Sequence, residues 1–274
     1  MFLNDLKTIY QDNRDKDPFF VRNLLKESIQ YYVLHFISQS KWSKNLIFKG
    51  GTCLRIFFDL PRLSEDLDFD IDDITLFDID IFTHELQKYF VSTVQFAHLE
   101  TKLAGNKRTL YLKFPILSEL GMTTNRDESN TIFVRIDVGQ ADGSAYTTEI
   151  SVKSSSHFSL LIKRYSFPDL MASKIAAILT REKFEGRIKV ERTKGRDYYD
   201  LIWYLEKNIQ PNWEYLTQII HLSKKEILNK LDAKIKNVDS QIIEDDLMPF
   251  FQDSNFVKTF SEHIKEIYLA KMLK

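Results

Sequence analysis

The chain has 274 residues, of which 43% are hydrophobic and 28% are charged, and its 38 Lys and Arg residues nearly balance its 39 Asp and Glu residues. This composition is close to that of soluble globular proteins, which excludes intrinsic disorder and a collagen-like repeat. The single cysteine, Cys53, cannot form an internal disulfide, which is typical of a reducing compartment. We find neither a secretory signal nor a run of about 18 apolar residues, so we expect a cytoplasmic protein that spans no membrane.

The first part of the chain predicts helices and strands in alternation. Asp17 and Pro18 form an N-cap followed by proline at the first helical position, so we expect a helix from there to about residue 39. Leu67, Phe69 and Ile71 alternate with aspartates, which predicts a half-buried strand with an acidic outer face. Similar patterns predict a short strand at 46–48, helices at 52–58 and 78–90, strands at 93–103, 109–116 and 131–138, a hairpin turn at Gly105-Asn106 and a polar loop at 122–130.

Residues 139–163 mix turn and strand signals and receive no assignment. From residue 168 onward the pattern changes to helices, which we expect at residues 168–181, 197–206, 213–223, 226–236 and 255–273. The sequence therefore predicts an α+β fold. An N-terminal helix and a sheet core occupy residues 1–165, and a helical domain follows over residues 166–274.

Charge is segregated along this nearly neutral chain. Residues 62–80 contain eight acids and one base, whereas residues 181–196 contain seven bases and three acids. Solvated surfaces account for most such runs. The alternative is a cation-binding strand together with a polyanion-binding segment, as an enzyme that acts on metal-bound phosphates requires.

A glycine pair precedes the predicted helix at 52–58. Gly50 and Gly51 allow backbone N–H groups to approach a phosphate closely, and Thr52 adds a hydroxyl at the same place. A Gly-Gly pair alone most often makes only a turn. The spacing matches neither a P-loop nor a dinucleotide-binding motif.

Acidic side chains on the predicted strand at 67–71 are candidate metal ligands. Asp66 and Asp68 lie on one strand face about 6.6 Å apart, where two carboxylates can converge on a divalent ion. Magnesium prefers one or two protein carboxylates together with phosphate oxygens. The alternative is an edge strand with a solvated acidic face. Asp137 becomes a third carboxylate of this site only if its own strand pairs beside residues 67–71; otherwise it occupies a solvent-facing position.

Two further residues stand out in the helical part. Lys174 lies in the middle of a mostly apolar helix, where a lysine commonly extends its amine to the surface. Asp197 opens the next helix, with Asp200 one turn later, and helix-terminus electrostatics commonly explain an acid at that position. Taken alone, neither residue indicates catalysis.

Together these segments resemble the AbiEii/AbiGii-type toxin nucleotidyltransferases, which include the MenT-type toxins and belong to the polymerase-β-like nucleotidyltransferase superfamily. The superfamily signature is a Gly-Gly or Gly-Ser turn followed by an hDhDh strand, and here Glu65 stands where the first apolar residue of that strand would be. The resemblance implies a nucleotidyltransferase-type mixed-sheet core. It rests on four ordered blocks: FKGGTCLR at 48–55, LPRLSEDLDFDI at 60–71, DLMASKIAAILTR at 169–181 and KGRDYYDL at 194–201.

The resemblance also implies a role for each matched residue. Asp66 and Asp68 would hold Mg²⁺ or Mn²⁺, with Asp137 as a less regular third ligand. Asp197 would be the essential carboxylate of the last block, orienting either Lys174 or the acceptor. The triphosphate would be bound by Gly50, Gly51, Thr52, Arg55 and Lys174.

Enzymes of this family transfer a nucleoside monophosphate from an NTP to a hydroxyl and release pyrophosphate. Some extend tRNA 3′ ends and thereby block translation unless an antitoxin restrains them. The resemblance therefore implies a metal-dependent toxin with an NTP as substrate, an RNA acceptor, first of all tRNA, and an antitoxin partner. Two alternatives stay open: nucleotidylation of a small molecule or protein, and an inert binding module in a partner complex. The six histidines show no paired ligand spacing, which disfavours a metal-dependent hydrolase.

Overall fold

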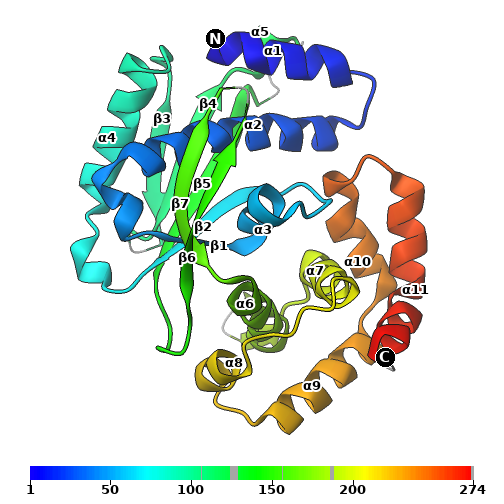
Figure 1. The fold of residues 1–274 in the computed structure, drawn as a ribbon. Helices are drawn as coiled ribbons and strands as arrows, with labels where there is room; N and C mark the ends of the chain where they lie inside the picture. Colours follow the sequence, from blue (N-terminus) through cyan, green and yellow to red (C-terminus); the bar gives the residue numbers. More distant parts are fainter. Residues whose placement is uncertain (106, 124–128, 156, 186–187, 273–274) are drawn as a thin grey trace. The chain divides into compact units, whose positions relative to one another are not determined.

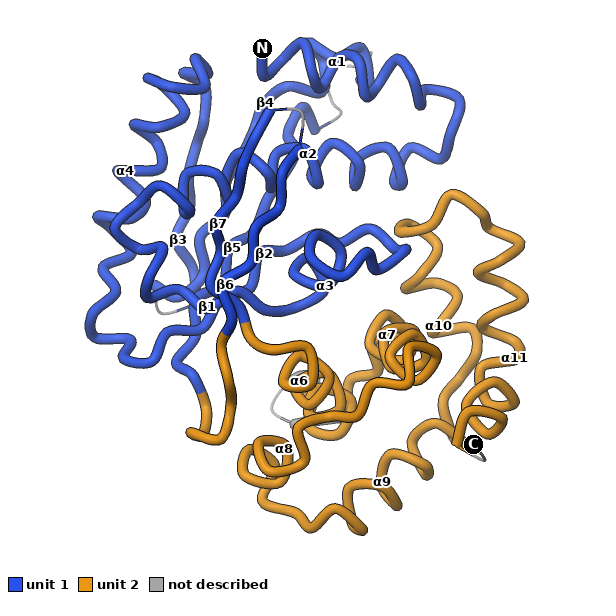
Figure 2. Tube along the Cα trace, in the orientation of Figure 1, with its two compact units in different colours: residues 1–141, 149–164 blue, residues 142–148, 165–274 orange. Residues whose placement is uncertain are grey.

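The computed structural model describes residues 1–105, 107–123, 129–155, 157–185 and 188–272, and the side chains of these residues outside 183–191. The backbone separates into two compact units, which Figure 2 shows in different colours. Unit 1 comprises residues 1–141 and 149–164, and unit 2 comprises residues 142–148 and 165–274. The division falls next to the boundary expected at residue 165, but no sequence pattern assigns the segment 142–148 to unit 2.

Unit 1 is built on a mixed sheet, as the sequence predicts. Its described strands follow the order β3-β4-β5-β2-β1-β7-β6 (Figure 1). The central strand β2 (Asp66–Ile71) is parallel to β5 (Thr131–Gln140) and antiparallel to β1 (Ile47–Lys49). The predicted α+β fold with a mixed-sheet core is therefore confirmed. The other strands are β3 (Glu100–Ala104), β4 (Thr109–Pro115), β6 (Thr148–Ser154) and β7 (Ser159–Tyr165).

Aromatic side chains fill the core between the sheet and the helices of unit 1. Phe48 and Phe69 stack across the β1–β2 pair with ring centroids 4.9 Å apart. Phe2 of the first helix contacts Phe90 and Phe114, and all five rings are buried. Burial of each such ring contributes about 1.5–3 kcal/mol. The helical segments of unit 1 are α1 (Phe2–Asn13), α2 (Pro18–Gln39), η1 (Lys41–Lys44), α3 (Gly50–Phe58), η2 (Ile74–Leu76), α4 (Ile79–Ser92) and α5 (Leu117–Leu120).

The strand predicted over residues 93–103 is wrong in its first half. Helix α4 continues to Ser92, and β3 begins only at Glu100. In between, Gln95 adopts a φ of 60°, which interrupts any extended backbone, and Phe96 N donates to Phe90 O at 2.8 Å. Phe96 is buried as part of this loop. An apolar residue such as Phe96 favours a strand in the sequence pattern. In the structure its side chain is buried by packing, although its backbone is in no strand.

Unit 2 is helical, as predicted, but contains elements that the sequence patterns do not predict. These are helix α10 (Ser240–Leu247), the turn η3 (Met248–Phe250) and a two-stranded sheet of β8 (Glu182–Glu185) and β9 (Ile188–Glu191). No helix among the described residues is both long and apolar enough to cross a bilayer. The predicted helices are present as α6 (Phe167–Thr180), α7 (Gly195–Glu206), α8 (Trp213–Ile220), α9 (Lys224–Asn237) and α11 (Ser254–Met272).

A buried carboxylate explains why the segment 142–148 belongs with unit 2. Asp169, in the first turn of α6, is fully buried. It accepts hydrogen bonds from Thr147 N at 2.9 Å, Ser166 Oγ at 2.5 Å and Asn212 Nδ2 at 2.7 Å. Hydrogen bonds to a charged group contribute about 1.5–3 kcal/mol each. One side chain therefore ties the segment, α6 and the start of α8 to one another.

Candidate active site

Carboxylates gather on the sheet face opposite to the aromatic core. Strand β2 places Asp66, Asp68 and Asp70 on this face, and its parallel pairing with β5 puts Asp68 directly beside Asp137. This pairing meets the condition under which the sequence makes Asp137 a neighbour of the two aspartates. Asp70 is buried, and Lys49 Nζ lies 2.6 Å from its Oδ1. The acidic face is therefore more than a solvated surface, because a buried carboxylate requires a partner charge.

Asp137 is held by two neighbouring side chains. Arg135 Nη2 lies 2.5 Å from Asp137 Oδ2, and Thr109 Oγ1 donates to Asp137 Oδ1 at 2.5 Å. Burial lowers the pKa of Arg135, but the charges of Asp137 and Asp66 outweigh burial and raise that pKa overall. Arg135 thus balances carboxylates of two adjacent strands. Sequence reasoning missed this residue, although its spacing of two from Asp137 places both side chains on one strand face.

The glycine turn lies against the acidic strand. Gly50 has a φ of 80°, in the left-handed region, and a Cβ at this position would collide with the carboxylate of Asp68. A Cβ on Gly51 would come within 2.7 Å of Nη2 of the buried Arg62. Gly50 therefore requires glycine because of its conformation and the close approach, and a side chain on Gly51 would displace the buried guanidinium of Arg62. As a result, the N-terminus of α3 adjoins the carboxylate of Asp68.

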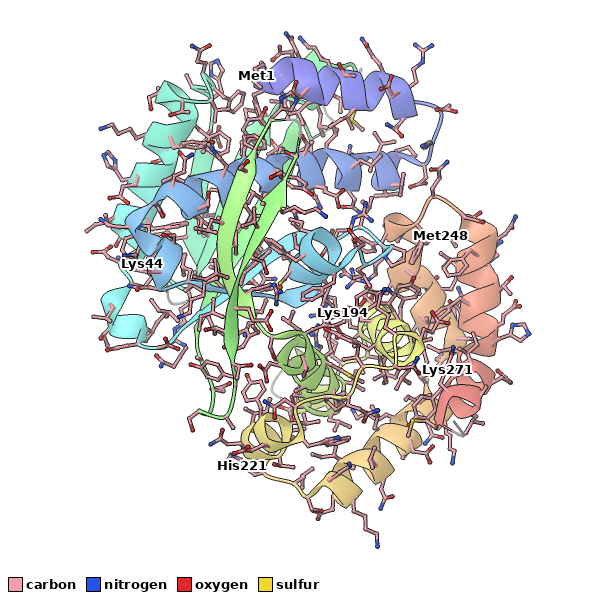
Figure 3. The ribbon with its side chains drawn as sticks, viewed as in Figure 1. Met1, Lys44, Lys194, His221, Met248 and Lys271 are labelled. Carbon is pink, nitrogen blue, oxygen red and sulfur yellow. The ribbon has the colours of Figure 1, made fainter. Side chains whose placement is uncertain are left out.

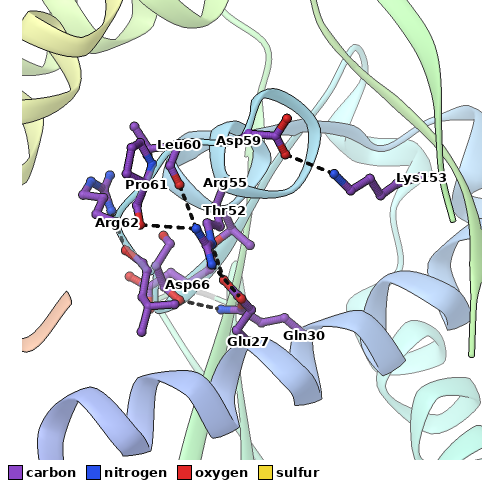
Figure 4. Close-up of polar contacts among 12 residues, drawn as sticks. Glu27, Gln30, Thr52, Arg55, Asp59, Leu60, Pro61, Arg62, Asp66 and Lys153 are labelled. Atoms are coloured by element: carbon purple, nitrogen blue, oxygen red, sulfur yellow. Dashed lines mark hydrogen bonds and ion pairs between the residues drawn. The ribbon is translucent and has the colours of Figure 1, made fainter. Parts of the chain in front are cut away.

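The side chains of Thr52 and Arg55 are used within the fold (Figure 4). Thr52 is buried and donates its hydroxyl hydrogen bond to the main-chain oxygen of Asp66, which ties α3 to β2. Arg55 pairs through Nε and Nη2 with Glu27 at 2.7 and 3.2 Å, and its Nη1 donates to Leu60 O at 3.1 Å. Binding of the triphosphate by these two residues stays a prediction. Their observed contacts hold the glycine turn in place.

In unit 2, Lys174 joins α6 to α7 through two ion pairs. Its Nζ lies 3.0 Å from Asp197 Oδ1 and 2.7 Å from Asp200 Oδ2. Arg181 Nη2 lies 3.1 Å from Asp197 Oδ2. Both carboxylates are buried, and only 13% of the Lys174 side chain is exposed. Lys174 therefore does not extend its amine to the surface, and Asp200 is a partner that sequence reasoning placed one turn from Asp197 without giving it a role.

The positive charges around Asp197 lower the pKa values of both Asp197 and Lys194. Burial raises the pKa of Asp197, but Lys174, Arg181 and Lys194 together lower it from 3.8 to about 2. Lys194 precedes α7 (Figure 3). Burial and the charge of Arg196, and then those of Lys174 and Arg181, lower the pKa of Lys194 to about 8 despite the opposing effect of Asp197. The carboxylate of Asp197 is therefore ionised throughout the neutral range.

Several predicted site residues lie together within each unit. In unit 1 these are Gly50, Asp68 and Asp137, and in unit 2 they are Lys174 and Asp197. In the described part of the chain, no group of three or more His, Cys, Asp or Glu side chains is arranged to hold a metal ion. The side chains of most of the basic segment 181–196 lie outside the described residues, so its proposed polyanion binding stays a prediction.

Comparisons with known proteins identify the family. Residues 32–265 match the family described as "Nucleotidyl transferase AbiEii toxin, Type IV TA system". No curated protein matches the chain. Among solved structures, the chain is similar to MenT4, a nucleotidyltransferase toxin from Mycobacterium tuberculosis H37Rv, with a TM-score of 0.56, 14% identity, and coverage of 97% of this chain and 89% of that one. A second similar structure is JHP933 from Helicobacter pylori, with a TM-score of 0.43, 16% identity, and coverage of 91% and 94%.

The family match spans most of the chain, and the likeness to MenT4 shows a shared fold. Both findings agree with the resemblance seen in the four sequence blocks. The chain therefore belongs to the AbiEii family of nucleotidyltransferase toxins of type IV toxin–antitoxin systems.

Proposed function

We propose that this protein transfers a nucleoside monophosphate from an NTP to the 3′ end of a tRNA in a reaction that requires Mg²⁺. The transfer blocks translation when no antitoxin restrains the enzyme. The observation that carries the proposal is the close approach of the Gly50 turn to Asp68, on a strand whose neighbour carries Asp137. Backbone N–H groups at a helix start bind phosphate oxygens, and adjacent carboxylates bind the divalent cation that the same phosphates share.

Asp66 and Asp68 are the proposed metal ligands. They lie two residues apart on one face of β2, and both are half-buried. Magnesium takes one or two protein carboxylates and completes its coordination with water and phosphate oxygens, so these two side chains fit the ion. When bound, magnesium would polarise the α-phosphate and favour ionisation of the attacking hydroxyl. Asp137 is a third candidate, and its present contacts with Arg135 and Thr109 would have to change for it to bind the ion.

The remaining work is positioning and charge neutralisation. Backbone N–H groups of Gly50 and Gly51 bind the triphosphate. The resemblance to the family gives the amine of Lys174 the role of contacting nucleotide phosphates. Asp197 orients this amine, which the 3.0 Å contact between them supports. The acceptor oxygen forms a bond to the α-phosphorus as the bond to the β-phosphate oxygen breaks. Pyrophosphate leaves, and the proton of the hydroxyl passes to water.

Thr52 and Arg55 support this reaction as positioning residues. The hydroxyl of Thr52 holds α3 against Asp66, and Arg55 holds the end of α3 against Glu27. Both contacts keep the glycine turn next to the acidic strand. Loss of either contact would move the phosphate-binding N–H groups away from the carboxylates.

Label transfer from each of the four α-³²P-labelled NTPs to total cellular RNA tests the proposal. We expect a labelled tRNA-sized band with Mg²⁺ and no band with EDTA. Asp66→Asn and Asp68→Asn should abolish labelling without unfolding the protein. Asp72→Asn is the matched control, because Asp72 lies one strand position beyond β2 and its side chain is 60% exposed. This control should label RNA as the unchanged protein does.

Three results would contradict parts of the proposal. Equal labelling by folded Asp68→Asn would refute the metal assignment. Label in proteins or small molecules, with none in RNA, would refute an RNA acceptor and favour nucleotidylation of a protein or small molecule. Absence of label in every fraction would favour the inert binding module. An RNA acceptor also requires binding that weakens steeply with salt, because counterions are released from the phosphates.

A further inference from the structure

An exposed apolar patch lies at one edge of the sheet of unit 1. Strand β6 is the outermost strand next to β7 among the described residues (Figure 1). Ile150 and Val152 of β6 are 70% and 67% exposed, and Leu161 of β7 is 53% exposed. Ser155 N donates to Phe158 O at 2.8 Å, and this register places Val152 opposite Leu161. The three apolar side chains therefore share one face of the β6–β7 hairpin.

The same register determines which main-chain groups of β6 face outward. Hydrogen-bonded pairs alternate along an antiparallel ladder, so every second residue counted back from Ser155 directs its main-chain groups toward β7. These residues are Ser155, Lys153, Ser151 and Glu149. The 2.9 Å ion pair between Glu149 and Arg164 agrees with this register. Ile150 and Val152 then direct their N–H and C=O groups away from the sheet. Such an edge is a template for another strand.

The sequence of β6 is complementary to itself when two copies run antiparallel. With a two-fold axis at Ser151, Glu149 of one copy faces Lys153 of the other, and Ile150 faces Val152. This register also brings the outward main-chain groups of Ile150 and Val152 opposite each other, as hydrogen bonding requires. Shifting the two copies by one residue would lose the hydrogen bonds between Ile150 and Val152. Shifting them by two would separate Glu149 from Lys153.

We propose that the protein forms a symmetric homodimer by antiparallel pairing of β6 with β6 of a second copy. The two seven-stranded sheets then become one continuous sheet across the two-fold axis. Ile150, Val152 and Leu161 of both copies form a single apolar cluster on one face. The pairs of Glu149 with Lys153 lie on the other face. This dimer is independent of the proposed transferase reaction.

Existing contacts of the two charged residues are compatible with the dimer. Lys153 pairs with Asp59 at 3.2 Å (Figure 4), and Glu149 pairs with Arg164. The side chains of Asp59 and Glu149 are 84% and 53% exposed. The exposed pair of Lys153 with Asp59 contributes little, so Lys153 can turn to the second copy. The side chain of Arg164 is only 8% exposed, so Glu149 keeps this buried partner and is shared with Lys153 of the second copy.

Sedimentation velocity of the full chain over a series of protein concentrations tests the proposal. The unchanged protein should pass from monomer to dimer as its concentration rises. Glu149→Lys and Lys153→Glu each place two like-charge pairs across the two-fold axis, so each should raise the dimer dissociation constant about tenfold or more. The combined E149K/K153E variant restores both pairs and should return to within about threefold of the unchanged protein.

The combined variant separates the dimer from effects within one chain. Its intrachain pairs with Arg164 and Asp59 stay broken, so recovery can come only from pairing between copies. Glu100→Lys makes the same charge change on β3, at the opposite edge of the sheet, and should leave the dissociation constant unchanged. A protein that is monomeric at every concentration would overturn the proposal. So would folded single variants that dimerise normally, or a combined variant no better than they are.

Discussion

Replacing Lys174 by methionine should destabilise unit 2 strongly. The amine of Lys174 lies between Asp197 and Asp200, and both carboxylates are buried. Methionine preserves much of the side-chain volume but leaves two buried negative charges with less compensation. Arg181 still reaches Asp197 at 3.1 Å, so Asp200 suffers the larger loss. Removal of one partner of a buried ion pair typically costs about 3–5 kcal/mol, which we expect here for the free energy of unfolding.

The pKa of Asp197 provides a second, pH-dependent measure of the same cluster. A drop from 3.8 to about 2 corresponds to about 2 kcal/mol of stability. Because this pKa is lowered by folding, the contribution is complete above pH 3.8 and disappears as the pH falls toward about 2. In the Lys174→Met variant the pKa of Asp197 rises. The difference in unfolding free energy between the unchanged protein and this variant should therefore shrink when the pH is lowered from 7 toward the acid range.

Urea-induced unfolding followed by tryptophan fluorescence measures both effects. Trp203 and Trp213 lie in unit 2 and Trp42 in unit 1, so a Trp42→Phe background restricts the signal to unit 2. In the control, K174M is combined with D197N and D200N. This variant has neither of the two carboxylates that Lys174 compensates and should recover most of the loss. A loss below about 1 kcal/mol, or a deficit that is independent of pH, would refute the reasoning.

Two other contacts lead to predictions of the same kind. Gly50→Ala should cost about 1–2 kcal/mol for the left-handed backbone and also displace Asp68, so label transfer should be lost. Gly121 also has a positive φ, of 79°, but a Cβ there would meet no carboxylate, so Gly121→Ala should lose stability and keep activity. Equal activity of the Gly50 and Gly121 variants would contradict the role of the glycine turn. Arg55→Met and Glu27→Gln should each lower the free energy of unfolding by about 1.5–3 kcal/mol in denaturant titrations. The double variant should cost little more than either single one, and additive losses would show that the pair is not coupled.

Local sequence signals predicted many of the elements in their correct order. The Asp17 cap, where Phe19 N and Phe20 N donate to the carboxylate, starts α2 as predicted. The alternation of aspartates with apolar residues predicted β2. These signals act within a few residues along the chain, so they can be recognised without the tertiary structure. The hairpin β6–β7 was missed because residues 139–163 mix turn and strand signals. Ile150 and Val152 do alternate with polar residues, but their side chains are exposed and belong to no buried face.

The candidate ligands could be named from sequence because four ordered blocks resemble a known family, whereas the carboxylates and glycines alone also fit a solvated strand and a simple turn. Their partners could not, because partner choice depends on contacts between distant segments. The pairing of β2 with β5 sets Asp68 beside Asp137 and brings Arg135 between carboxylates of both strands. Likewise, the packing of α6 on α7 gives Lys174 its two buried carboxylates. Short-range patterns thus determine which groups are present. Long-range packing determines which charges meet and lose their water, and this in turn sets the pKa values and geometry of the site.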